Sequence, residues 1–155
     1  MSGPSSYHRI FYHFTWATKG RFPTITPLIE ETVRKIAFSK ARDLGFHVLA
    51  INGAEDHMHM VVRGSTTLAP ETIIRHVKGA SSHFINRDPR INAESREPFR
   101  WQGGFGVVSV SPFMVKSVIA YVNRQKEHHP TRGVMSELEI DGEETSIVDD
   151  TEELQ

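Results

Sequence analysis

The stretch that decides the fold reads Glu55-Asp56-His57-Met58-His59-Met60-Val61-Val62. It begins with charged residues and becomes an apolar run typical of a β-strand, in which side chains alternate between the two faces of a sheet. His57 and His59 should therefore share one face, while Met58, Met60 and Val62 point to a core on the other. Two imidazoles on one face can hold a divalent metal, although ordinary strand histidines would give the same pattern. Further ligands would have to come from elsewhere in the chain.

An aromatic segment, residues 7–17, predicts the first strand of the chain. Its alternation places three aromatic side chains on one face: Tyr12, Phe14 and Trp16. Residues 27–44 predict a helix, because their apolar positions follow helical spacing. Thr26 supplies an N-cap, Pro27 suits the first turn and Gly45 can end the helix.

The remaining segments predict further strands and helices. Residues 46–51 predict a strand, and Asn52-Gly53 predicts a tight turn into the histidine strand, which places the histidines near the rim of a sheet. Residues 70–86 predict a second helix, 107–110 a short strand and 111–128 a third helix. The expected fold class is α+β, an antiparallel sheet with helices packed on it.

The charge of the chain is divided between a basic body and an acidic tail. Residues 136–155 hold nine Asp and Glu and no Lys or Arg, so residues 1–135 carry 18 basic against 10 acidic residues, a formal charge of +8. A basic body suits a polyanion such as nucleic acid, although it can also be a solvated surface. We expect one domain over residues 1–130 and a disordered acidic tail over 131–155.

Composition excludes several other classes. The 155 residues include no cysteine, which rules out disulfides, thiolate ligands and a cysteine nucleophile. There is no apolar run long enough to span a membrane and no secretory leader, so a cytoplasmic protein is expected.

Nucleic acid would have several basic and aromatic side chains to contact. A basic loop follows the first strand, the second helix carries cations, and residues 87–100 contain four arginines before a glycine-rich segment with aromatic residues. Each of these side chains could equally be an ordinary solvent-exposed or core residue with no role in binding. The candidates for DNA binding are Lys19, Arg21, Arg75, Lys78, Arg100 and Trp101.

Two further polar residues lie on the third predicted helix. Tyr121 and Gln125 are four residues apart and share one flank of its apolar stripe, where side chains are neither fully buried nor fully exposed. A tyrosine there can be a nucleophile and a glutamine an oxygen ligand for a metal. Tyr121 could also simply pack its ring with the hydroxyl in water.

The order of these motifs resembles that of the single-tyrosine transposases of the HUH endonuclease superfamily, the insertion-sequence two-hundred-like family that includes the REP-associated tyrosine transposases. The resemblance covers about residues 7–129. The motifs, in chain order, are YHFTWATKGRFP (12–23), DHMH (56–59), HVKGASSHFIN (76–86), WQGGFGVVSVS (101–111) and YVNRQ (121–125).

This resemblance implies a ferredoxin-like or RRM-like HUH endonuclease fold and a chemistry for each site residue. His57, His59 and Gln125 match the ligands of a catalytic Mg²⁺ or Mn²⁺. Tyr121 matches the nucleophile that attacks a DNA phosphodiester to give a 5′-phosphotyrosine link. The implied substrate is single-stranded DNA with a hairpin near the element ends, and homodimers are common in the family. Phe105 departs from the pattern, because a tyrosine is common at that position.

Two other functions remain open from the sequence. The chain could be a host-adopted protein that binds hairpin DNA or RNA without cutting it, although no catalytic group is missing. It could also be a metal-dependent phosphoesterase that uses the histidines on a small substrate, although the basic body argues against this.

Overall fold

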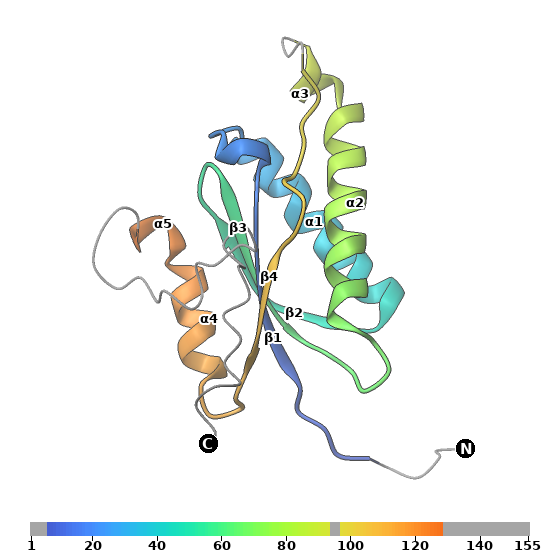
Figure 1. Cartoon of the computed structure of the whole chain (residues 1–155), viewed down its shortest axis with the longest axis vertical. Coiled ribbons are helices and arrows are strands. Elements are labelled where there is room, and N and C mark those ends of the chain that lie inside the picture. Colours follow the sequence, from blue (N-terminus) through green and yellow to red (C-terminus); the bar gives the residue numbers. More distant parts are fainter. Residues whose placement is uncertain (1–5, 94–96, 129–155) are drawn as a thin grey trace, which may run out of the picture.

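Four antiparallel strands form one sheet with helices on both faces (Figure 1). The computed structural model describes residues 6–93 and 97–128, and the predicted acidic tail lies outside them. The strand order is β2-β3-β1-β4. The strand bounds are β1 (Phe11–Ala17), β2 (His47–Gly53), β3 (His57–Arg63) and β4 (Gly106–Val110). This architecture confirms the predicted α+β class.

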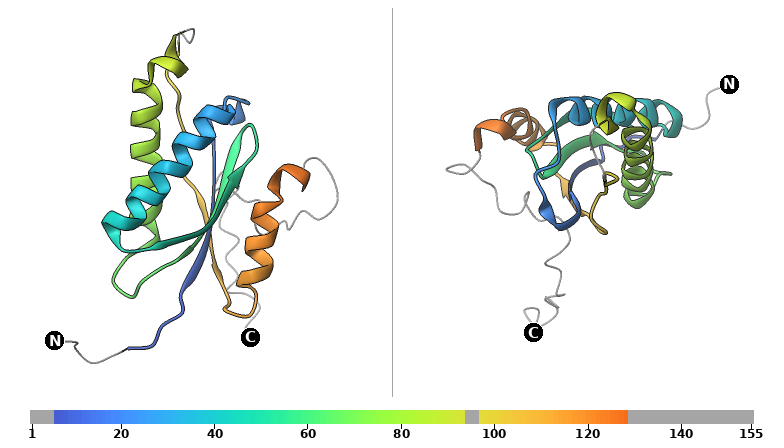
Figure 2. Two further views of the ribbon diagram at one scale, coloured as in Figure 1. Left: turned by 180° about the vertical axis from the view of Figure 1, so that it is seen from behind. Right: turned by 90° about the horizontal axis from the view of Figure 1, so that it is seen from above.

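The helices are divided between the two faces of the sheet (Figure 2). Helices α1 (Pro27–Leu44) and α2 (Pro70–Arg87) cover one face. Helix α4 (Val115–Asn123) and the single turn α5 (Gln125–His128) lie on the other. Two short helices complete the described chain: η1 (Lys19–Arg21) and α3 (Pro89–Asn92). Within the described residues, no helix has the length and apolar character needed to cross a bilayer.

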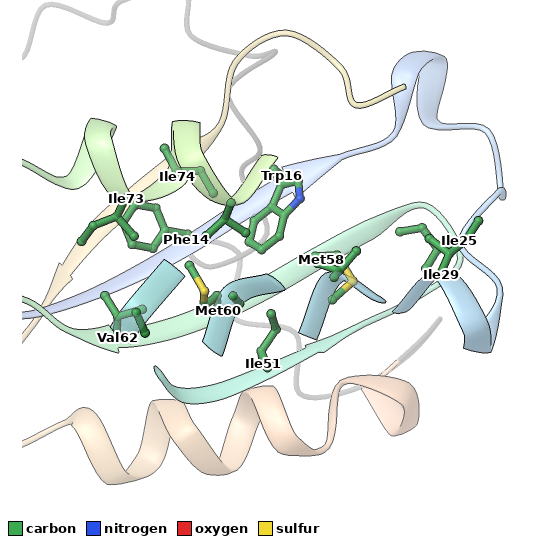
Figure 3. Close-up of a cluster of buried hydrophobic side chains, with 14 of the residues drawn as sticks. Phe14, Trp16, Ile25, Ile29, Ile51, Met58, Met60, Val62, Ile73 and Ile74 are labelled. Atoms are coloured by element: carbon green, nitrogen blue, oxygen red, sulfur yellow. The ribbon is translucent and has the colours of Figure 1, made fainter. Parts of the chain in front are cut away.

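The larger core lies between the sheet and helices α1 and α2, and Figure 3 shows its side chains. Strand alternation builds it as predicted, because every second residue of β1 and β3 points into this layer. Its strand residues include Phe14, Trp16, Met58, Met60 and Val62, all fully buried. The opposite face of the same strands packs on α4 through a smaller cluster that includes Val61, Val110, Val118 and Val122.

Helix α1 has the predicted bounds and the predicted caps. The side-chain oxygen of Thr26 accepts a hydrogen bond from the backbone N–H of Ile29 at 3.3 Å. Gly45 has φ +87°, a left-handed conformation that a residue with a Cβ rarely adopts. Local sequence signals therefore fix both ends of this helix.

The prediction of a tight turn at Asn52-Gly53 was wrong. Both residues belong to β2, where Asn52 pairs with His59 and Gly53 pairs with Met58. The hairpin closes instead over residues 54–56, with Ala54 N–H donating to the carbonyl of His57 at 3.0 Å. The histidines lie on an inner strand, between β2 and β1, and His57 is the first residue of that strand after the hairpin.

The third helix is shorter than predicted and broken. Ser111 caps a turn, because its side-chain oxygen accepts from Phe113 N–H at 3.2 Å, and α4 begins only at Val115. At Arg124 the backbone leaves helical geometry (φ −102°, ψ 18°), and this break separates α4 from α5.

The arginine-containing segment of residues 87–100 includes the short helix α3. Its N-cap is Asp88, whose carboxylate accepts from the N–H of Arg90 at 2.9 Å. This cap was present in the sequence as an Asp-Pro pair, but the helix is too short to show a periodic apolar pattern.

Candidate metal and nucleophile site

The two histidines of β3 lie on the face that packs against α4. His57, the first residue of β3, pairs with Ala17, the last residue of β1, and His59 pairs with Thr15. His57 is 2% exposed and His59 is 0% exposed. Strand alternation predicted their shared face correctly, but not this burial.

His57 is held at both ring nitrogens. Burial raises the pKa of the Asp56 carboxyl, but its hydrogen bond and charge interactions with His57 and Arg21 outweigh burial, and the pKa falls below its ordinary value. An ionised Asp56 can only accept, so His57 Nδ1–H donates to it at 2.7 Å. Gln125 Nε2–H then donates to the lone pair of His57 Nε2 at 3.1 Å. This tautomer presents Nε2 as the nitrogen available to a metal.

His59 is held at Nδ1 by residues of β1. His13 Nε2 lies 2.9 Å from His59 Nδ1, and Thr15 Oγ1 lies 3.4 Å from the same atom. The rings of His13 and His59 stack with centroids 5.0 Å apart and an interplanar angle of 29°. The ring of His57 meets that of His59 edge-on at 5.0 Å. His13 was not singled out in the sequence, although the alternation that buries Phe14 places it on this face.

Tyr121 and Gln125 approach the histidines from the broken helix. The ring of Tyr121 lies 6.3 Å from that of His59 at an interplanar angle of 85°. Each of the two residues is only 2% exposed, so the prediction of a half-exposed flank was wrong. The flank is covered because Tyr121 packs directly on the sheet, in the same cluster as Val118 and Val61.

Lys126 attaches the single turn α5 to the rest of the fold. Its Nζ donates to both carboxylate oxygens of Glu30 at 2.7 and 2.9 Å, to Asn52 Oδ1 at 2.8 Å and to the carbonyl of Gly53 at 3.1 Å. These contacts join α5 to α1 and β2. They also fix the position of the neighbouring residue, Gln125.

The donor atoms fit a divalent metal if Gln125 contributes oxygen. Gln125 Oε1 is buried and has no hydrogen-bond partner among the described residues. The same described residues contain no group of three His, Cys, Asp or Glu side chains arranged to hold a metal. Two imidazole nitrogens and one amide oxygen are therefore the donors that these residues offer to a divalent metal.

The predicted DNA-binding residues fall into two groups. Lys19, Arg21 and Arg100 are exposed and lie together, since Lys19 N–H donates to the carbonyl of Arg100 at 3.0 Å. Arg21 also joins this group to the site through an ion pair with Asp56 at 3.3 Å. Arg75 is exposed on α2, where it pairs with Glu71.

Lys78 and Trp101 are both engaged within the fold. Lys78 Nζ donates to the carbonyls of Gln102 and Gly104 at 2.8 and 2.6 Å, and burial lowers its pKa. The indole N–H of Trp101 donates to Ser81 Oγ at 2.9 Å, and the ring meets that of Phe99 edge-on at 4.7 Å. Both side chains therefore hold the glycine-rich segment against α2.

The antiparallel sheet with helices on both faces agrees with the fold expected from the resemblance to single-tyrosine transposases. The chain belongs to the IS200-like transposase family, whose model, described as "Transposase IS200 like", matches residues 6–125. None of the curated proteins matches the chain.

Two solved structures are similar to the chain in fold. A candidate transposase from Deinococcus radiodurans R1 has a TM-score of 0.58 and 19% identity, with 81% of this chain and 97% of that chain covered. A REP-associated tyrosine transposase bound to a REP hairpin has a TM-score of 0.57 and 18% identity, with 83% of this chain and 75% of that chain covered.

Proposed function

We propose that the protein is a metal-dependent transposase that cleaves and rejoins single-stranded DNA through a covalent bond to Tyr121. One observation carries the proposal: the tyrosine ring and the amide of Gln125 meet His59 and His57 on the buried face of the sheet. Gln125 and His57 are 68 residues apart in the chain, so only the fold brings them together. A tyrosine that served only for packing would not need a buried imidazole beside its ring.

Each residue of the site would have a separate role in holding the metal. His57 Nε2, His59 Nε2 and Gln125 Oε1 would hold the Mg²⁺ or Mn²⁺, after the Gln125 amide turns its oxygen toward His57. When bound, such an ion polarises the scissile phosphate and offsets the charge that develops on it. Asp56 orients His57 through Nδ1, which leaves Nε2 for ligation.

In the cleavage step, Tyr121 Oη attacks the phosphorus. The Oη–P bond forms as the bond from phosphorus to the 3′ oxygen breaks, the phenol proton passes to water, and the 3′ oxygen takes up a proton. The product is a 5′-phosphotyrosine and a free 3′-hydroxyl. The phosphotyrosine conserves the energy of the broken bond, so the reverse reaction rejoins a strand without a nucleotide cofactor.

The proposed substrate is single-stranded DNA that carries a hairpin. The basic body of the chain, the exposed cations Lys19, Arg21 and Arg100, and Arg75 on α2 support contact with the phosphate backbone. The similar structure bound to a REP hairpin supports a hairpin as the recognised shape. A homodimer, common in the family, is the proposed assembly.

The test is formation of a covalent adduct. The protein, Mn²⁺ and a hairpin-bearing single strand from the flanks of its own gene should give a protein–DNA band that survives denaturation. Tyr121→Phe should abolish this band and leave DNA binding nearly unchanged. The chain has three tyrosines, which makes Tyr7→Phe and Tyr12→Phe matched controls that should keep the adduct. An adduct that survives Tyr121→Phe would refute the assignment.

A further inference from the structure

His13 contacts the metal-site histidine from the side opposite to its proposed ligating nitrogen. It lies on β1 two residues before Thr15, the direct pairing partner of His59. This diagonal position lets its long side chain reach across the strands. The resulting contact joins His13 Nε2 to His59 Nδ1 at 2.9 Å, and both rings are buried, at 1% and 0% exposure.

One proton is shared in a hydrogen bond between two neutral imidazoles, and its position determines what His59 can do. If His59 Nδ1–H donates to His13 Nε2, then His59 Nε2 has a lone pair and can bind a metal. If His13 Nε2–H donates instead, His59 carries its proton on Nε2 and cannot bind a metal there. The tautomer of His13 is therefore coupled to the ligating capacity of His59.

We infer that His13 is a positioning residue that accepts the Nδ1 proton of His59 and so holds His59 Nε2 ready to bind the divalent metal. This inference rests on the proposed function, because it takes His59 as a ligand. It mirrors the role of Asp56 toward His57, so that each proposed histidine ligand has its own acceptor at Nδ1.

The position of His13 also distinguishes a positioning residue from a further metal ligand. In an imidazole the lone pairs of Nδ1 and Nε2 point in different directions, and His13 occupies the Nδ1 side of His59. A metal on His59 Nε2 would lie away from the His13 ring. The stacking of the two rings, at 29°, further fixes the orientation of His59. Thr15 Oγ1 is a weaker alternative acceptor, because its distance to the same nitrogen is 3.4 Å.

The first measurement uses the unmutated, metal-free protein. Long-range ¹H–¹⁵N correlation spectra of its histidine rings report which nitrogen carries the proton. We expect His59 to be protonated on Nδ1 and His13 to accept at Nε2. A His59 ring protonated on Nε2 would overturn the inference, whatever the activity of the enzyme.

The second measurement is Mn²⁺ binding by calorimetry for three full-length variants. His13→Phe keeps a stacking ring but removes the acceptor, and we expect it to weaken Mn²⁺ binding by about 10- to 100-fold, the usual effect of losing such a partner. His13→Gln restores an acceptor near the position of Nε2 and should bind Mn²⁺ nearly as well as the unmutated protein. His57→Ala should abolish tight binding.

The three variants separate two kinds of failure. Unchanged Mn²⁺ affinity in a folded His13→Phe protein, with loss of binding in His57→Ala, would overturn the role of His13 alone. Unchanged affinity in both would overturn the metal site and with it the proposed function. If His13→Phe and His13→Gln lose binding equally while both remain folded, the acceptor role is also refuted, because restoring the acceptor then brings no recovery.

Discussion

Replacing Gly53 by alanine should distort the metal site from the neighbouring strand. Gly53 is the last residue of β2 and pairs with Met58. A Cβ at this position would stand 2.6 Å from the carbonyl oxygen of His57 and would also collide with the sulfur of Met58. The sulfur can move, because it ends a flexible side chain. The carbonyl can move only if the first residue of β3, His57 itself, moves with it.

The size of the effect can be worked out from a matched pair of glycines. Overpacking of this kind costs about 1–3 kcal/mol, so Gly53→Ala should lower the free energy of unfolding by that amount. Gly79 is exposed within α2, and a Cβ there would meet nothing within 4 Å. Gly79→Ala should therefore raise the free energy of unfolding by about 0.5–1 kcal/mol, because glycine disfavours helix interiors. The two variants should differ by about 1.5–4 kcal/mol.

Urea unfolding followed by circular dichroism measures these changes, and calorimetry with Mn²⁺ measures the site. With a urea slope of about 1–3 kcal/mol per molar, the two midpoints should be separated by roughly 0.5–4 M. Gly53→Ala should also bind Mn²⁺ more weakly, while Gly79→Ala should bind it normally. A Gly53→Ala protein as stable as Gly79→Ala and with normal Mn²⁺ affinity would refute this account of the β2–β3 hairpin.

Two further predictions concern lysines that hold structure around the site. Lys126→Met should weaken Mn²⁺ binding several-fold, because α5 loses its contacts with Glu30 and β2 and no longer fixes Gln125. The free energy of unfolding should change by less than about 1 kcal/mol, because the Lys126 side chain is 59% exposed; a larger change with normal Mn²⁺ affinity would contradict this role. For Lys78, burial lowers the pKa in the folded protein, so the unfolded chain binds more protons between that pKa and the ordinary value of 10.5. The stability of the unmutated protein relative to Lys78→Met should thus rise as the pH increases through this window, and a flat difference in urea midpoints would contradict it.

Much of the fold could be predicted because its signals are local. The caps at Thr26 and Gly45 and the alternation around His57 and His59 each depend on a few adjacent residues. The prediction of a turn at Asn52-Gly53 was wrong because a turn motif expresses only a local preference. Here the pairing of β2 with β3 continues through both residues. The six residue pairs between β2 and β3 outweigh the turn preference of two residues.

The parts of the site that were missed depend on contacts between distant segments. The burial of Tyr121 follows from how closely α4 packs on β2 and β3, which an amphipathic pattern does not specify. The break at Arg124 places Gln125 in a separate turn, held by a lysine whose partners lie on α1 and β2. No residue near Arg124 in sequence signals this arrangement.

The position of His13 shows how the core pattern and the site are coupled. Strand β1 places Phe14 and Trp16 in the larger core and His13 and Thr15 against His59 on the other face. A slip of one residue in the pairing of β1 with β3 would exchange these faces, exposing the large core to two polar side chains and moving both acceptors away from His59. The burial of two large aromatic rings opposes such a slip strongly. The same apolar residues that stabilise the sheet therefore hold the His13–His59 contact in register, which explains how a polar pair can be positioned without any polar signal of its own in the sequence.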